Sequence, residues 1–184
     1  MKSLRHQSVQ PASVPLMADD ILEFHAARVL LLIAICGTND ALSSLTKMAK
    51  LDFFVRYPDF YLAAVAGDNS VGAPREHKAS VEAAMVRHHY GPWDKRYYHI
   101  LAFLEACRLI TVRKSGRSIR LTLTKLGKNR AKRLSGMSAF AKLRSHMEEV
   151  GAAFGAKTGN ELKTLIYQTF DEEIRRKPLG HVIG

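Results

Sequence analysis

The spacing of apolar residues predicts a mainly helical chain that begins with a buried helix. Residues 21–36, ILEFHAARVLLLIAIC, are apolar nearly all round in their second half, which is typical of a central core helix. Gly37 would end this helix, and Asp19 or Asp20 would cap its start. The preceding residues 1–18, rich in Ser, Gln and Pro, are predicted to form a flexible arm.

The next stretch predicts two further helices and a loop. Asp40 can cap a helix that runs to a break at Pro58 and has apolar residues at helical spacing: Leu42, Leu45, Met48 and Ala49. Residues 59–67, DFYLAAVAG, predict a short helical piece. Residues 67–80 contain Gly, Asn, Ser and Pro, and predict a loop.

A third amphipathic helix is predicted after Gly91 and Pro92. Asp94 can cap it, and it would run from Lys95 to about Cys107. Its inward face would hold Tyr97, Ile100, Leu101 and Leu104, and its outward face Lys95, Arg96, His99 and Ala102.

Period-two alternation predicts a β-hairpin directly after this helix. Ile110 and Val112 share one face of the first strand, and residues 119, 121 and 123 are apolar in the second, with KSGRS as the tip. Another helix would follow at residues 123–134 and break near Ser135-Gly136. Two amphipathic helices come last, with apolar stripes at Phe140, Leu143, Met147, Val150 and Phe154, then at Leu162, Leu165, Ile166 and Phe170.

Charge is segregated along the chain, whose formal net charge is +11. Residues 106–147 hold twelve of the 28 Lys and Arg and no acidic residue, which leaves 16 cations against 17 anions elsewhere. Such a concentration is typical of a surface for a polyanion, although a basic surface kept for solubility gives the same pattern. Cys36 and Cys107 stand in apolar segments and predict buried thiols in a reducing compartment.

The order helix, helix, capped helix, basic hairpin, helix is typical of a winged helix-turn-helix. The stretch LTLTKLGKNRAKRL resembles the L-T-x-x-G-x-x-x-A stretch common after the wing of bacterial winged-helix proteins. In such proteins the third helix enters the major groove and the wing reaches phosphates or the minor groove. The expected DNA-binding residues are Lys95, Arg96, Arg113, Lys114, Arg117, Arg120, Lys128, Arg130, Lys132 and Arg133.

Three stretches carry a closer resemblance: KLDFFVRYP, GPWDKRYYHILAFLEACRLITV and LKTLIYQTF…PLGHVIG. They resemble the middle component of bacterial three-component ABC ATPase systems, small winged-helix proteins encoded beside an SMC-like ATPase and an effector component. Lamassu-type phage and plasmid defence systems include similar subunits. The resemblance implies that the chain sits on the ATPase, and the matching motif positions are Lys50, Asp52, Arg56, Trp93, Asp94 and Arg96.

Enzymatic and metal chemistry find little support in the sequence. GAAFGAKTG, residues 151–159, lacks one glycine of a phosphate-binding loop and follows a predicted helix, so Thr158 with Glu161 favours a capping box there. The adjacent His88 and His89 cannot converge on one metal, and no cofactor is expected. Asp52 and Arg56 could form an ion pair within one helix. Trp93, Tyr97 and Tyr98 could stack on bases, but core packing against the wing is favoured.

These patterns together predict a cytoplasmic, non-enzymatic winged-helix protein of residues 19–135, with a C-terminal helical extension and tail over 136–184. We expect it to serve as an accessory subunit of an SMC-like ATPase complex with an effector subunit. It would bind double-stranded DNA non-specifically through the basic wing, with no membrane or small-molecule substrate. The apolar stripe bearing Leu165 and Phe170 would contact the ATPase, with Phe170 the more outward-facing; core packing is the alternative. The alternative function is a homodimeric, sequence-specific transcription regulator.

Overall fold

A computed structural model describes residues 21–67, 85–88, 91–170 and 178–180, which form seven α-helices, a short 3-10 helix and five short strands. Several predicted features lie outside the described residues. They are the N-terminal arm, the candidate caps Asp19 and Asp20 of the first helix, residues 68–80 of the predicted loop, His89 and most of the tail. The elements are α1 (Leu22–Cys36), β1 (Ala41–Leu42), α2 (Leu45–Arg56), α3 (Pro58–Ala66), β2 (Val86–His88), β3 (Gly91–Trp93), α4 (Tyr97–Ala106), β4 (Ile110–Ser115), β5 (Ser118–Leu123), α5 (Lys125–Ser135), the 3-10 helix (Ser138–Phe140), α6 (Ala141–Phe154) and α7 (Gly159–Thr169).

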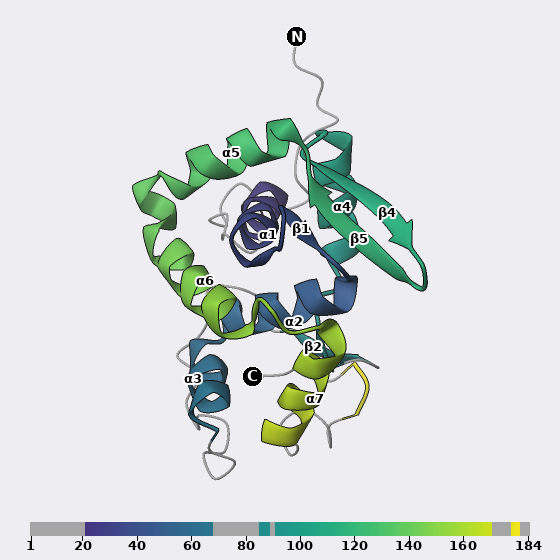
Figure 1. Cartoon of the computed structure of the whole chain (residues 1–184), viewed down its shortest axis with the longest axis vertical. Helices are drawn as coiled ribbons and strands as arrows, with labels where there is room; N and C mark the ends of the chain where they lie inside the picture. Colours follow the sequence, from purple (N-terminus) through teal and green to yellow (C-terminus); the bar gives the residue numbers. More distant parts are fainter. Residues whose placement is uncertain (1–20, 68–84, 89–90, 171–177, 181–184) are drawn as a thin grey trace, which may run out of the picture.

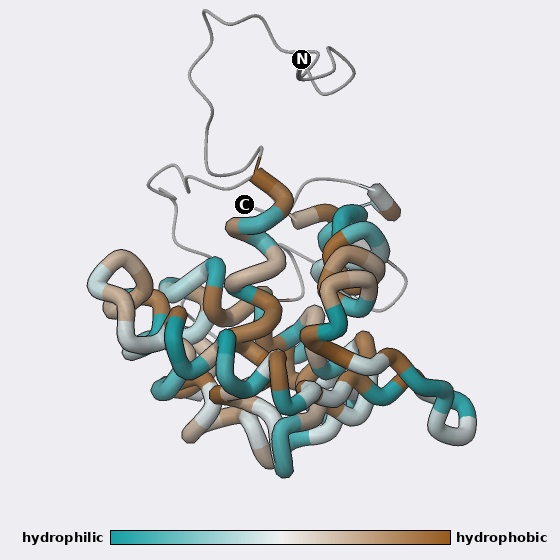
Figure 2. The backbone as a smooth tube through the Cα atoms, turned by 90° about the horizontal axis from the view of Figure 1, so that it is seen from above, coloured by the Kyte–Doolittle hydropathy of each residue, from teal (hydrophilic) through white to brown (hydrophobic). Residues whose placement is uncertain are grey.

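Helix α1 lies at the centre of the molecule, as its continuous apolar run predicts. Figure 1 shows it end-on, with α2, α4, α5, α6 and the β4–β5 hairpin arranged around it. The side chains from Val29 to Ile33 are at most 1% exposed. In Figure 2 the hydrophobic colouring concentrates inside the molecule, whereas the hairpin that projects from it ends in hydrophilic residues.

A tight turn connects α1 to α2, and it corrects the predicted role of Asp40. Asn39 and Asp40 both have positive φ, 53° and 57°, between Thr38 and Ala41, which exchange backbone hydrogen bonds. Asn and Asp tolerate this left-handed conformation better than other residues with side chains. Asp40 is therefore a turn residue, and the cap of α2 is Ser44, whose hydroxyl accepts a hydrogen bond from the Lys47 backbone N–H.

The antiparallel sheet has the strand order β1-β5-β4. The predicted hairpin is confirmed, with Ile110 opposite Leu123 and Val112 opposite Leu121. Ile110, Leu121 and Leu123 are buried, whereas the residues toward the tip are exposed. A second, two-stranded sheet joins β2 to β3; strands of three residues gave no periodic signal in the sequence.

The L-T-x-x-G stretch has a structural role at the start of α5. The Thr124 hydroxyl accepts a hydrogen bond from the Gly127 backbone N–H and lies 2.7 Å from the Arg108 carbonyl oxygen. A Cβ atom on Gly127 would stand 1.9 Å from the Leu109 carbonyl oxygen. Only glycine therefore allows the first turn of α5 to pack this closely against the chain that leaves α4.

The two C-terminal helices pack on the same core as the rest of the chain. Met147, Val150 and Phe154 of α6 and Leu162 and Ile166 of α7 are buried in one cluster with residues of α1 and α2. Lys47 of α2 donates a 2.6 Å hydrogen bond to the Gly155 carbonyl at the end of α6. Both predicted amphipathic stripes exist and face the core, which for α7 is the alternative to the expected contact with a partner.

Candidate nucleic-acid interface and the buried network behind it

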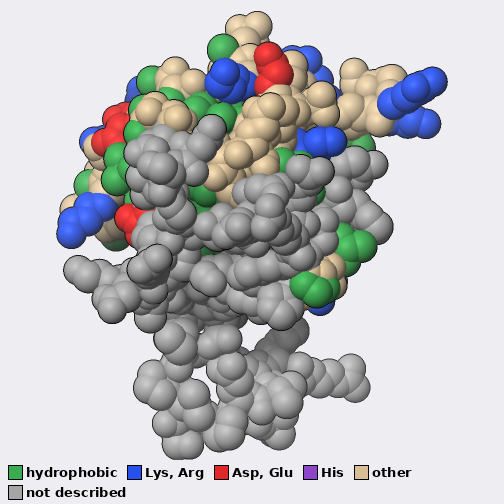
Figure 3. All heavy atoms as spheres, turned by 90° about the horizontal axis from the view of Figure 1, so that it is seen from below, with side chains coloured by type: hydrophobic (Ala, Val, Ile, Leu, Met, Phe, Trp, Pro, Cys, Tyr) green, Lys and Arg blue, Asp and Glu red, His purple; other side chains and the backbone are tan. Residues whose placement is uncertain are grey.

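The β4–β5 hairpin presents its predicted cations to solvent. The side chains of Arg113, Lys114, Arg117 and Arg120 are all exposed. The hairpin extends beyond the body of the molecule, and Figure 3 shows Lys and Arg side chains gathered on the projection at its upper right. A cationic projection of this kind can reach a phosphate backbone without moving the core.

The basic side chains of α5 differ in their exposure and in their neighbours. Lys132 and Arg133 are exposed. Lys128 lies 2.5 Å from the Asp40 carboxylate, although half of its side chain remains exposed. Arg130 is also exposed but lines an apolar groove between α1, α4 and α5. Among the predicted contacts on this helix, Arg130, Lys132 and Arg133 are thus exposed without an ion pair in the described part of the chain, and Lys132 and Arg133 also lie outside the apolar groove.

At the start of α4 the structure separates the two predicted DNA contacts. Lys95 is exposed, whereas the Arg96 guanidinium hydrogen-bonds to both carboxylate oxygens of Asp94, at distances of 2.7–3.2 Å. Arg96 Nη1 also lies 2.9 Å from His25 Nε2. Arg96 therefore has a structural role in this turn, while 29% of its side chain remains exposed, and its contact with DNA stays a prediction.

The exposed face of α4 is mostly uncharged. Tyr98 is 62% exposed, and its ring packs against Trp93 with centroids 5.9 Å apart. Core packing is confirmed for Tyr97 and Trp93, which are 0% and 8% exposed, and is wrong for Tyr98. Tyr97 and Trp93 contact each other edge to face, with centroids 5.2 Å apart.

Behind this surface lies a buried ion pair between α1 and α2. Arg28 donates to both carboxylate oxygens of Asp52, at 2.8 and 3.3 Å, and both side chains are fully buried. The Tyr97 hydroxyl of α4 donates a 2.7 Å hydrogen bond to the same carboxylate. Burial and the negative charge of Asp52 raise the pKa of Tyr97 well above its ordinary value, so this hydroxyl keeps its proton.

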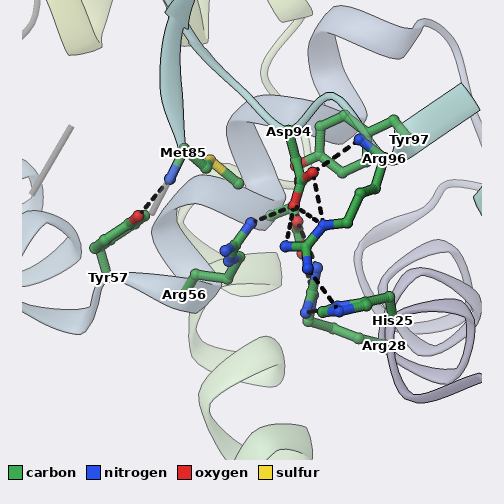
Figure 4. A network of polar contacts seen from close by, with 9 residues as sticks. His25, Arg28, Arg56, Tyr57, Met85, Asp94, Arg96 and Tyr97 are labelled. Carbon is green, nitrogen blue, oxygen red and sulfur yellow. Dashed lines mark hydrogen bonds and ion pairs between the residues drawn. The ribbon is translucent and has the colours of Figure 1, made fainter. Parts of the chain in front are cut away.

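A second group of side chains continues this network (Figure 4). Arg56 of α2 donates a 2.9 Å hydrogen bond to Asp94, which also binds Arg96. His25 lies between the two groups, with Nδ1 3.0 Å from Arg28 and Nε2 2.9 Å from Arg96. Burial alone would raise the pKa of Asp94, but the hydrogen bonds and charge of Arg96, together with Arg56, lower it to about 2.

Lys50 is a third buried group beside the network. Its side chain is 0% exposed, and its ammonium donates a 2.8 Å hydrogen bond to the Pro92 carbonyl oxygen of β3. Burial, assisted by the positive charge of Lys163, lowers the pKa of Lys50 to about 7. Gly91, with φ of +94°, stands next to it, and a Cβ atom there would lie 3.4 Å from the Lys50 amine.

The network fixes α4 against α1 and α2, and it contains four of the six motif positions of the sequence resemblance, with Lys50 and Trp93 packed beside it. Lys50, Asp52 and Arg56 come from α2, whereas Trp93, Asp94 and Arg96 come from β3 and the turn before α4. The sequence left open an ion pair of Asp52 with Arg56 within their helix; instead each pairs with a residue of another element. His25 and Arg28 were missed, although an arginine inside so apolar a helix is a signal for a buried partner.

The two predicted partner-binding residues occupy different environments. Leu165 is half-buried on α7, whereas Phe170 is 0% exposed and packs edge to face on Phe60 of α3, with ring centroids 4.7 Å apart. Phe170 therefore belongs to the core of this chain. The expectation that Phe170 faces outward more than Leu165 is wrong, because the ring fills the gap between α3 and α7.

The remaining candidate chemistry resolves into structural roles. Thr158 and Glu161 form a capping box at the start of α7, as the alternative to a phosphate-binding loop predicted. Cys36 is buried, and burial raises the pKa of its thiol to about 12. Cys107 is exposed, which corrects the prediction that both thiols are buried. Within the described residues, no three His, Cys, Asp or Glu side chains gather as metal ligands would.

Comparison with known proteins adds no assignment. No family model, no curated protein and no solved structure matches this chain. Within the described part of the chain, every helix is too short or too polar to cross a bilayer.

Proposed function

We propose that this chain is a non-enzymatic, winged-helix subunit that holds duplex DNA through phosphate contacts and serves an SMC-like ABC ATPase complex in bacterial anti-phage and anti-plasmid defence. The observation that carries the proposal is the exposed cationic hairpin, set in a stretch of 42 residues, 106–147, that contains no acidic residue. In space, Glu105 accepts a hydrogen bond from the Val112 backbone N–H and Asp40 pairs with Lys128, but the four arginine and lysine side chains of the hairpin are exposed to solvent and can approach a phosphate backbone.

The order of the elements supports a winged helix. Helix α1, strand β1, helices α2 and α4 and the β4–β5 hairpin follow one another as the elements of that fold do, with β1 paired to β5. Helix α3 and the β2–β3 hairpin stand between α2 and α4 as additions. In this arrangement α4 is the recognition helix and β4–β5 is the wing.

The outer face of α4 favours binding without strong sequence choice. Reading base edges takes Arg, Lys, Asn or Gln side chains directed into the major groove. Here the exposed positions are Lys95, Tyr98, His99, Ala102, Glu105 and Ala106, and Arg96 is held by Asp94 and His25. Lys95 alone supplies a cation, so the phosphate contacts of the hairpin would dominate affinity.

The ATPase part of the proposal rests on the three resembling stretches and on the C-terminal helices. The half-buried Leu165 of α7 remains the candidate contact with the ATPase, whereas Phe170 is buried in the core of this chain. The buried network would then keep α4 and the hairpin in a fixed relation to α1 and α2 while the complex moves on DNA.

Selection of duplexes from a random library tests the choice between an accessory subunit and a transcription regulator. The proposed subunit should bind unselected duplexes almost as well as the selected pool. A palindromic consensus with half-sites about 10 base pairs apart would instead establish the regulator. A matched control neutralises the exposed Lys157, which lies outside the basic stretch, and should leave binding unchanged.

A further inference from the structure

An apolar groove opens between α1, α4 and α5 and includes Leu109, which precedes β4. It encloses about 390 Å³. Leu30 and Leu104 are buried in it, Phe103 and Leu134 are half-buried along its walls, and Leu126 at its rim is 49% exposed. An exposed leucine beside an apolar groove is a combination that a second macromolecule can cover.

One acidic and one basic side chain frame the groove. Glu23 lies on α1 and Arg130 on α5, and both are exposed. Neither forms an ion pair or hydrogen bond with another residue of the described part of the chain. The two charges that line the groove therefore have opposite signs, so the groove of one copy can pair Glu23 with Arg130 of a second copy.

We propose that a second copy of this chain covers the groove in a two-fold symmetric dimer. In such an interface the same surface of both copies meets, so a residue that contacts another is contacted by it in return. Glu23 of each copy would then face Arg130 of the other, and Leu126 of each copy would fill the other copy's groove. The two charges of opposite sign make the surface complementary to itself, whereas a surface with charges of only one sign would repel its own copy.

Dimerisation would bring two basic hairpins into one particle. A pair of linked DNA contacts binds one duplex more tightly than either contact alone when the geometry lets both engage. The inference about self-association does not depend on the proposed function, because the mass of the free protein in solution is measured without DNA or ATPase.

Light scattering and sedimentation of the full chain over a wide range of concentrations provide the test. The unmodified chain should reach the mass of a dimer. Leu126→Asp and Arg130→Glu should each shift it to a monomer, and Glu23→Arg combined with Arg130→Glu should restore the dimer by exchanging the two charges. Met137→Asp is the control, since Met137 is 51% exposed but does not line the groove. All these positions are exposed, and thermal melting should show the variants folded.

Cys107 gives an independent geometric test, because it lines the groove and is exposed whereas Cys36 is buried. A bismaleimide with a short spacer should join two copies through Cys107, and Cys107→Ser should abolish the cross-link. A chain that stays monomeric at every concentration overturns the proposal, and would mean that another occupant, such as the chain's own N-terminal residues or a different protein, covers the groove. A dimer that persists in Leu126→Asp, or that fails to cross-link, overturns it equally.

Discussion

Arg113 on β4 and Arg120 on β5 stand directly opposite each other across the antiparallel hairpin, and both side chains are exposed. Like charges in directly opposed positions destabilise a strand pair. The neighbouring pair, Thr111 opposite Thr122, shows that uncharged residues fit the same sheet. A hairpin that keeps two arginines face to face is suited to a polyanion that neutralises both.

The first prediction separates stability from binding at this pair. Arg113→Thr should raise the free energy of unfolding by roughly 0.2–1 kcal/mol, because it removes repulsion from Arg120. The same change should weaken binding to duplex DNA, because it removes a phosphate contact. Denaturant unfolding and fluorescence anisotropy measure the two effects. A variant that is less stable, or that binds DNA as tightly as the unmodified chain, would contradict this account.

The second prediction concerns the buried pair of Arg28 and Asp52. Asp52→Ala should cost about 3–5 kcal/mol of stability, because it leaves the Arg28 guanidinium buried without its carboxylate. The double variant Arg28→Met with Asp52→Ala should cost clearly less than the sum of the two single changes, Arg28→Met and Asp52→Ala. Chemical denaturation of the three variants measures the coupling. Strictly additive effects would show that the two side chains do not act as a pair.

Sequence patterns predicted the helices well because the apolar stripes of α4, α6 and α7 have a clear helical period and face the core. The hairpin was equally visible, since the buried Ile110, Leu121 and Leu123 alternate with the more accessible Thr111, Arg120 and Thr122. The strands β1, β2 and β3 were missed because two or three residues are too short for any period. Asp40 was misassigned because a turn and a helix cap favour the same residue types.

The buried network could be predicted only in part. Asp52, Arg56, Asp94 and Arg96 were recognisable as motif positions, but His25 and Arg28 were missed. The partners lie far along the chain: Arg28 and Asp52 are 24 residues apart, and Arg96 and His25 are 71 apart. No local spacing encodes such contacts, so the sequence suggested the pair of Asp52 and Arg56 on one helix. Phe170 was misjudged for the same reason, because its neighbour Phe60 belongs to a distant helix.

The third prediction is a pH dependence caused by Lys50. Its pKa in the folded chain, about 7, lies below the ordinary value of 10.5, so between these values the unfolded chain binds more protons. Stability should therefore rise as the pH increases from 7 to about 9, below the range where Cys36 and Tyr97, whose pKa values are raised, begin to oppose it. Lys50→Met should remove most of this rise in thermal melts. Identical pH profiles for the two proteins would contradict the prediction.

The fourth prediction distinguishes the two apolar residues at the C-terminal end. Phe170→Asp should unfold or strongly destabilise the chain, because it buries an unpaired charge against Phe60. Leu165→Asp, at a half-buried position, should leave a folded protein that no longer co-purifies with the ATPase and still binds DNA. Circular dichroism and co-purification measure both. A folded Leu165→Asp variant that retains the ATPase would reject the docking role of α7.

The central claim, that the basic hairpin binds a phosphate backbone, is tested most directly by the affinity for a random duplex at increasing salt. With several cations on β4, β5 and α5 in contact with phosphates, the logarithm of the affinity should fall linearly with the logarithm of salt concentration, with a slope of about −0.9 for each contact. Replacing Arg113, Lys114, Arg117 and Arg120 by serine should make the slope shallower, whereas the Lys157→Ser control should leave it unchanged. A slope near zero, or no binding at low salt, would contradict the account.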